Sequence, residues 1–262
     1  MRSTAIRALP VTAILPLLLL SSGCDIATAS LRHTETAEWR KTYEVQPGGR
    51  VEIRNVNGAI EVEAGTGNTV EVVAKKSARG ATAEDAKRNL DRLEIVEQSD
   101  ASSVKVETKT GGNFFGSHGS ITYVVRVPAG RHLHFSTVNG GVELRSVSGE
   151  ITAETTNGGV RAHNVSGSIT ATTTNGGVEV DVAQLGEQGA RLECTNGGVG
   201  IRLPADARAS ISARVSNGGI DTSGLQLDTT ESSRRRLEAK LNGGGVPVKL
   251  EGVNGGIRIS SR

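Results

Sequence analysis

The chain has 262 residues, of which 34 are glycine, and its 30 basic and 28 acidic side chains leave a net charge of +2. This near balance gives no electrostatic reason to expect binding to nucleic acid or to an acidic surface. Aromatic residues make up only 2% of the chain, and two cysteines are too few for a disulfide framework. The core must therefore be built from small aliphatic side chains, which suits a thin interior repeated many times.

The first 23 residues are typical of a bacterial lipoprotein signal peptide. Arg2 and Arg7 form a positive start, and the apolar run over residues 8–20 is too short for a comfortable membrane span. The next residues, Ser21-Ser22-Gly23-Cys24, resemble a lipobox, although Ser21 stands where that pattern prefers leucine. We therefore predict export, lipidation of Cys24 and a polar tether over residues 24–37.

Lipidation predicts a protein anchored to a membrane and facing the periplasm or the cell exterior, because several acyl chains together hold a protein firmly. The alternative is ordinary cleavage after Ala27-Thr28-Ala29. That cleavage would discard Cys24 and release a soluble periplasmic or secreted protein.

Residues 38–130 are expected to form a β-rich part that carries one helix. Strand patterns occur at 70–72, 104–106 and 121–125. Thr82 followed by Asp85 has the spacing of a helix cap, and the apolar residues after it share one face of a helix near 83–93.

A repeated turn sequence dominates the rest of the chain. Apolar residues alternate on both sides of an Asn-Gly-Gly or Asn-Gly-Ala step, which predicts strands that meet at a turn. Asparagine and glycine both tolerate positive φ, so both are expected to supply it there. Asn242 lacks the flanking apolar residues and is expected to lie in a loop. Seven copies remain, at Asn57, Asn139, Asn157, Asn175, Asn196, Asn217 and Asn254.

Two all-β architectures fit this repeat: an antiparallel meander with two-residue turns and a parallel β-solenoid with two short strands in each coil. Identity recurs at 18 residues, where Val147-Ser148-Gly149 returns as Val165-Ser166-Gly167. A solenoid stacks each residue on its equivalent one coil away, whereas a meander has no reason to repeat identity at every second strand. We therefore predict a parallel β-helix or β-solenoid over residues 131–262, with about 18–21 residues per coil.

The order of these motifs resembles a bacterial domain family of unknown function known as the "putative adhesin" family. The resemblance runs from Glu38 to Ser260 and is carried by the run at 51–63, by 122–128 and by the serial Asn-Gly-Gly-Val units. It implies a right-handed, β-helix-like fold at the cell envelope. It implies no catalytic residues, since none is established for the family.

The outward positions of the predicted coils give no sign of an active site. Carbohydrate-cleaving β-helix enzymes need carboxylates that converge on one face. Here acids alternate with bases at two levels, which is typical of charge pairing on a solvated face. The two levels hold Glu143, Arg161 and Glu179, and Arg145, His163 and Asp181.

No metal or cofactor site is expected either. His132 and His134 share one side of a strand, but no third ligand lies nearby in the sequence, so a surface pair is the better interpretation. Cys194 occupies an inward position and is expected to be a buried, inert thiol. Phe114 and Phe115, between glycines, either form a contact loop or plug an end of the core.

We therefore expect a non-enzymatic, adhesin-like or scaffold module, with a glycan, peptidoglycan or a protein as its ligand. The alternatives are a polysaccharide-acting enzyme and an accessory component of envelope-stress signalling.

Overall fold

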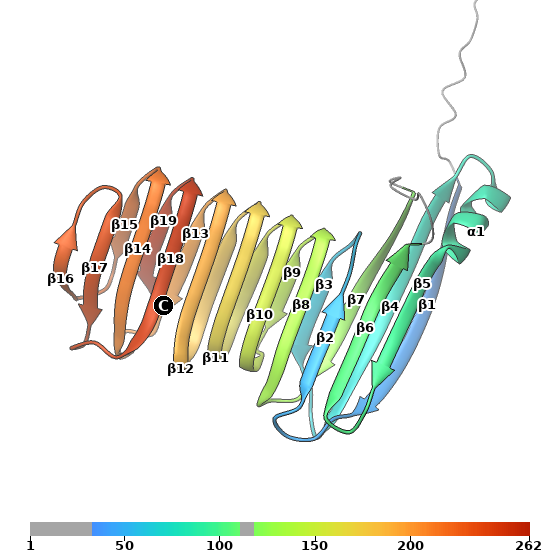
Figure 1. Cartoon of the computed structure of the whole chain (residues 1–262), viewed down its shortest axis with the longest axis horizontal. Helices are drawn as coiled ribbons and strands as arrows, with labels where there is room; N and C mark the ends of the chain where they lie inside the picture. The colour runs from blue at the N-terminus through green and yellow to red at the C-terminus, as the bar shows by residue number, and fades with distance from the viewer. Residues whose placement is uncertain (1–32, 111–117) are drawn as a thin grey trace, which may run out of the picture. The chain divides into compact units, whose positions relative to one another are not determined.

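The structure is a computed structural model that describes residues 33–110 and 118–262. The described part of the chain contains nineteen strands, linked by their pairings into one mixed sheet, and one short helix. The sheet folds into two layers, here called face A and face B, which enclose a single aliphatic core (Figure 1).

Face A consists of strands that are mostly parallel along its middle and antiparallel at both ends. In spatial order its strands are β5 (Leu93–Ser99), β6 (Ser103–Thr110), β2 (Arg50–Arg54), β8 (Arg131–Asn139), β10 (Ser148–Asn157), the second halves of β11 (Val160–Asn175) and β12 (Val178–Asn196), β18 (Val246–Asn254), β14 (Ala209–Asn217), β17 (Arg236–Leu241) and β16 (Leu227–Ser232).

Face B is antiparallel only at its first strands and parallel from there on. Its strands are β1 (His33–Glu44), β4 (Thr69–Gly80), β7 (Gly119–Val127), β3 (Ile60–Ala64), β9 (Val142–Arg145), the first halves of β11 and β12, β13 (Val199–Leu203), β19 (Ile257–Ser261) and β15 (Ile220–Ser223).

The 18-residue repeat produces the parallel stacking that identity at that period predicts. Val160 pairs with Val142 on one side and with Val178 on the other. On face A, Ile151 pairs in parallel with Ile169. The antiparallel meander is therefore wrong for this region, and the fold is β-solenoid-like.

The order of the last coils differs from the order of the sequence. Strand β18 pairs in parallel with β12 on one side and with β14 on the other. Asn254 thus lies between Asn196 and Asn217 in space. The intervening hairpin of β16 and β17 pairs antiparallel with β14, and this carries the chain back to insert its final coil.

The N-terminal part does not form a separate sheet, because β2 and β3 pair directly with β8 and β9. Strand β1 begins at His33, so residues 33–37, which we expected in the tether, belong to a strand. Its twelve residues are mostly exposed and carry little apolar alternation, so their pattern did not predict a strand. The predicted strands at 70–72, 104–106 and 121–125 lie within β4, β6 and β7.

The predicted helix is α1 (Ala83–Asp91), and the Thr82 side chain accepts a hydrogen bond from the Asp85 backbone N–H as its N-cap. Ala86 and Leu90 are its buried residues. They pack the helix on β4 and β1, near one end of the stacked strands (Figure 1).

A polar network lies inside the first coil. The Thr108 hydroxyl donates to Asn55 Oδ1 at 3.0 Å and contacts the Tyr123 hydroxyl at 2.8 Å. The Asn55 amide donates to the carbonyl oxygens of Gly58 and Ile121 at 3.0 and 2.7 Å. These bonds satisfy polar groups that would otherwise be costly to bury.

Candidate ligand-binding surface

The seven repeat asparagines form one continuous ladder along the corner where face A turns into face B. The side-chain amide of every asparagine after Asn57 donates to the Oδ1 atom of the preceding one at 2.8–3.0 Å. In space the order is Asn57, Asn139, Asn157, Asn175, Asn196, Asn254 and Asn217.

The turn geometry corrects the expectation that asparagine supplies positive φ. Only three non-glycine residues in the described part have positive φ, namely Ser146, Asn164 and Asn242, and none of them belongs to the ladder. The glycine after each ladder asparagine takes that conformation, as Gly158 does with φ +154°. At these positions asparagine therefore contributes its side-chain amide, which forms the ladder. Asn242 lies in a turn between β17 and β18, as its missing apolar neighbours predict.

A second row of hydrogen bonds lies just inside the corner. The hydroxyls of Thr137, Thr155 and Thr173 donate to glycine carbonyl oxygens one coil away at 2.7–3.0 Å. Cys194 takes the same position in the next coil, and its thiol donates to the Gly176 carbonyl oxygen at 3.1 Å. Its side chain is buried, as predicted, and burial raises the pKa of the thiol.

On face A, the two histidines pair with carboxylates. His132 Nδ1 lies 2.8 Å from Glu150, and His134 Nε2 lies 3.6 Å from Glu154. Within residues 33–110 and 118–262, no cluster of three or more His, Cys, Asp or Glu side chains could hold a metal ion. No helix in the same residues is long and apolar enough to cross a membrane.

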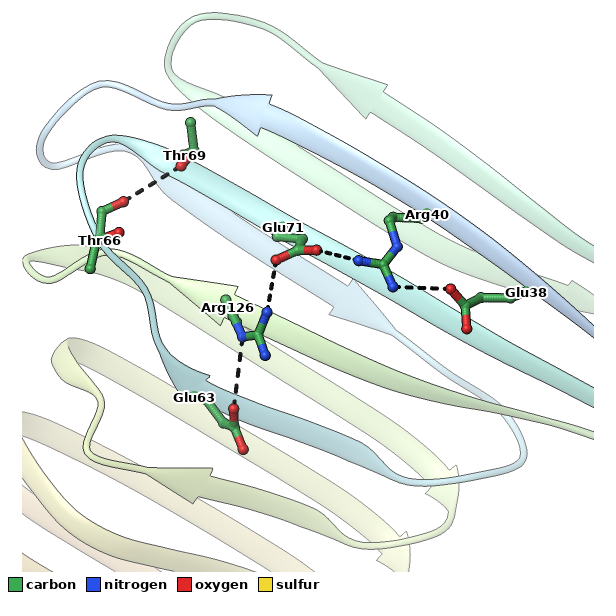
Figure 2. A network of polar contacts seen from close by, with 7 residues as sticks. All are labelled: Glu38, Arg40, Glu63, Thr66, Thr69, Glu71 and Arg126. Atoms are coloured by element: carbon green, nitrogen blue, oxygen red, sulfur yellow. Dashed lines mark hydrogen bonds and ion pairs between the residues drawn. The ribbon is translucent and has the colours of Figure 1, made fainter.

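On face B, a chain of ion pairs crosses the outer surface of the first strands (Figure 2). Arg40 of β1 bridges Glu38 and Glu71 at 3.1 and 2.8 Å. Arg126 of β7 bridges Glu71 and Glu63 at 3.1 and 3.9 Å. These contacts tie edge strand β1 to the sheet across β4. Each of these pairs is exposed to solvent and therefore contributes little to stability.

The chain of charges continues into the repeats. Arg145 of β9 pairs with Glu63 and Glu143 at 3.7 and 2.6 Å. Arg161 is in register with Glu143 and Glu179, as the coil alignment predicts. The second predicted level is interrupted, because a register shift follows Ala162. Asp181 of β12 instead lies in strand register with Arg202 of β13.

A hollow of about 400 Å³ interrupts face B over β12, β13 and β19. Its lining includes Gly198 and Gly200 together with several charged side chains. The charged residues that line it are His163, Glu179, Asp181, Arg202, Asp221 and Arg258. The Arg262 guanidinium engages Asp181 at 3.0 Å, and Arg258 approaches Asp221 at 3.7 Å.

We did not predict this hollow from the sequence, although the sequence contains a signal for it. The fourth residue after each repeat asparagine is charged in six of the seven copies and is glycine only at Gly200. The six charged residues are Glu61, Glu143, Arg161, Glu179, Asp221 and Arg258. The remaining predicted residues of interest, Cys24, Phe114 and Phe115, lie outside the described residues.

These features define a β-solenoid-like repeat domain with a largely polar outer surface, which is charge-paired on the first strands of face B. The chain belongs to the toastrack family DUF4097, whose model matches residues 51–260. No curated protein matches the sequence.

A solved structure shows the same fold at low sequence identity. A "putative cell adhesion protein" from Clostridium sporogenes ATCC 15579 is 10% identical, with a TM-score of 0.51 over 86% of this chain and 100% of the other. A "putative adhesin" from Bacteroides fragilis NCTC 9343 is 8% identical, with a TM-score of 0.31 over 85% of this chain and 97% of the other.

Proposed function

We propose that this protein is a non-catalytic, adhesin-like binding module displayed at the bacterial cell envelope. The observation that carries the proposal is face B, where outward charged residues recur in six of the seven repeat copies and pair across neighbouring strands at the first coils. A flat, regularly spaced polar surface suits an extended partner, which it would bind through many weak contacts. The similarity to proteins described as adhesins supports this proposal.

The positions of the carboxylates argue against hydrolysis of a glycan. Glu179 and Asp221 are three strands apart across β13 and β19, which places them ~14 Å apart at ~4.8 Å per strand. An inverting glycosidase needs about 6.5–9.5 Å between its two carboxyl groups and a retaining one needs about 5–5.5 Å. Asp181 is closer to Glu179, but the guanidinium of Arg262 already engages it.

The test is to incubate purified full-length protein with envelope material from a bacterium that carries it, including peptidoglycan and surface polysaccharide. We expect the protein to sediment with one of these polymers without releasing new reducing ends. The single variants Glu179→Gln and Asp221→Asn test whether either carboxylate is required for any hydrolysis that is observed. Release of reducing ends by the wild type that either variant abolishes would contradict the non-catalytic assignment.

We further propose that the module is held at a membrane through a lipid on Cys24. The lipobox-like residues before Cys24 support this. In cells fed a fatty-acid probe, the wild type should be labelled and should fractionate with membranes, and Cys24→Ala should do neither. Unlabelled, soluble wild-type protein that begins at Ser30 would establish cleavage after Ala29 instead.

A further inference from the structure

The hollow on face B exists because one outward side chain is missing. Gly200 of β13 lies in register between Glu179 of β12 and Arg258 of β19. Both neighbours carry long side chains that point away from the core, so they stand on either side of a gap that is one strand wide. The glycines before the strands, including Gly177, Gly198 and Gly256, lower the surrounding surface as well.

The backbone does not require glycine at position 200. Gly200 does not have positive φ, unlike Gly197 at +149°. A Cβ built on Gly200 would have Glu179 Cγ as its nearest neighbour at 3.8 Å, an ordinary van der Waals contact. A side chain would therefore fit, and its absence leaves open space that a ligand can enter.

Of the two arginines among the described residues that line this space, one has no close carboxylate and the other is held at longer range. Within the described residues, Arg202 has no carboxylate at ion-pair distance, because its neighbour in register, Asp181, engages Arg262 instead. Arg258 is held only by Asp221, at 3.7 Å. The Arg234 side chain passes Gly219 at the edge of the hollow, since a Cβ on Gly219 would lie 4.0 Å from Arg234 Cγ.

On the first strands of face B, three arginines are neutralised by close carboxylates. Arg40, Arg126 and Arg145 each contact two of them. The hollow thus combines the Arg202 guanidinium and the loosely held Arg258 guanidinium with the carboxylates of Glu179 and Asp221. Guanidinium groups bind a carboxylate in a bidentate manner, and carboxylates accept hydrogen bonds from hydroxyls.

We propose that the hollow binds a carboxylate-bearing sugar unit of an extended anionic glycan; this rests on the proposed function. Arg202 and Arg258 take the carboxylate of the sugar, and Glu179 and Asp221 accept hydrogen bonds from its hydroxyls. The volume of about 400 Å³ lies within the ~300–1,000 Å³ of ordinary ligand pockets. The flat surface on either side leaves room for the polymer to continue.

A comparison of two oligosaccharides tests the contribution of the carboxylate apart from that of the sugar rings. Hyaluronan oligosaccharide alternates glucuronate with N-acetylglucosamine, and chitin oligosaccharide of equal length contains N-acetylglucosamine alone. In calorimetric titrations of the full-length protein, we expect hyaluronan to bind more tightly than chitin by about tenfold or more, because a charge-assisted contact is gained. Inorganic phosphate at equal concentration should compete poorly.

Gly200→Gln should weaken hyaluronan binding about tenfold or more by filling the hollow, and Arg202→Gln should weaken it to a similar extent. Thr152→Gln, at an outward position of β10 on face A, is the matched control and should bind like the wild type. Thermal melts of all three variants should stay close to the wild-type melt.

Wild-type affinity in a folded Gly200→Gln variant would refute the site while leaving the proposed function intact. Equal affinity for chitin and hyaluronan would refute the requirement for a carboxylate. Full competition by phosphate would show a general anion site rather than a sugar site. If the wild type retains envelope polymer but binds neither oligosaccharide, this inference fails alone; if it retains no envelope component, the proposed function fails with it.

Discussion

The first glycine of the repeat turn offers the sharpest test of the fold, and we develop it for Gly158. Its φ of +154° is one that L side chains rarely adopt, and a Cβ there would lie 2.0 Å from the Gly140 carbonyl oxygen in the next coil. Alanine at position 158 must therefore push two coils apart.

The expected cost has two parts. The backbone strain at such a position is about 1–3 kcal/mol. Separation of the coils also weakens two hydrogen bonds. One is donated by the Gly140 N–H to the Asn157 carbonyl oxygen at 2.9 Å, and the other by the Asn157 side-chain amide to Asn139 Oδ1. Each such bond contributes ~0.5–1.5 kcal/mol. We expect Gly158→Ala to lower the free energy of unfolding by about 3 kcal/mol or more.

The matched control is Gly198→Ala, at the second glycine of another copy. That residue does not have positive φ, and its Cβ would lie 3.6 Å from the Gly256 carbonyl oxygen, an ordinary contact. It should be neutral or stabilising by up to about 1 kcal/mol. Denaturant titration followed by circular dichroism measures both variants. Equal midpoints for the two variants would refute the close approach of the coils at Gly158.

Three further outcomes follow from the hydrogen bonds and charges. Asn157→Val should lower the free energy of unfolding, measured by denaturant titration, by about 1–2 kcal/mol, because it removes two exposed hydrogen bonds of the ladder. The control is Thr156→Val at the neighbouring position, which should be near neutral. Equal losses of stability in the two variants would mean that the ladder contributes nothing. Burial raises the pKa of Tyr123 to about 12. Above pH ~10 the unfolded chain therefore gives up this proton more readily than the folded protein, which favours unfolding. Between pH ~10 and pH ~12 the free energy of unfolding of the wild type should fall by about 2–3 kcal/mol more than that of Tyr123→Phe. Parallel pH slopes for the two proteins would contradict this. Glu71→Gln should lower the free energy of unfolding, measured by thermal melts, by less than about 1 kcal/mol. The difference from the wild type should vanish in 1 M salt, which screens exposed charges. A difference that persists in salt would mean that the ion pairs of Glu71 are not screened.

The repeat itself determines the register of the coils. Because inward and outward side chains alternate with period two, and because identity recurs at 18 residues, Val142, Val160 and Val178 could be aligned from the sequence. The helix cap at Thr82, the loop at Asn242 and the buried Cys194 were also predictable, since each depends on residues close in sequence or on the repeat.

Only the tertiary structure decided the order of the last coils and the form of the hollow. Asn254 lies between Asn196 and Asn217 because the β16–β17 hairpin returns the chain along β14, and every copy of the repeat could have stacked equally well by its own pattern. That insertion brings Arg258 beside Gly200, 58 residues away in the sequence. A periodic sequence specifies how coils match but not which coils are neighbours, so the charges that surround Gly200 follow from the chain's path in space.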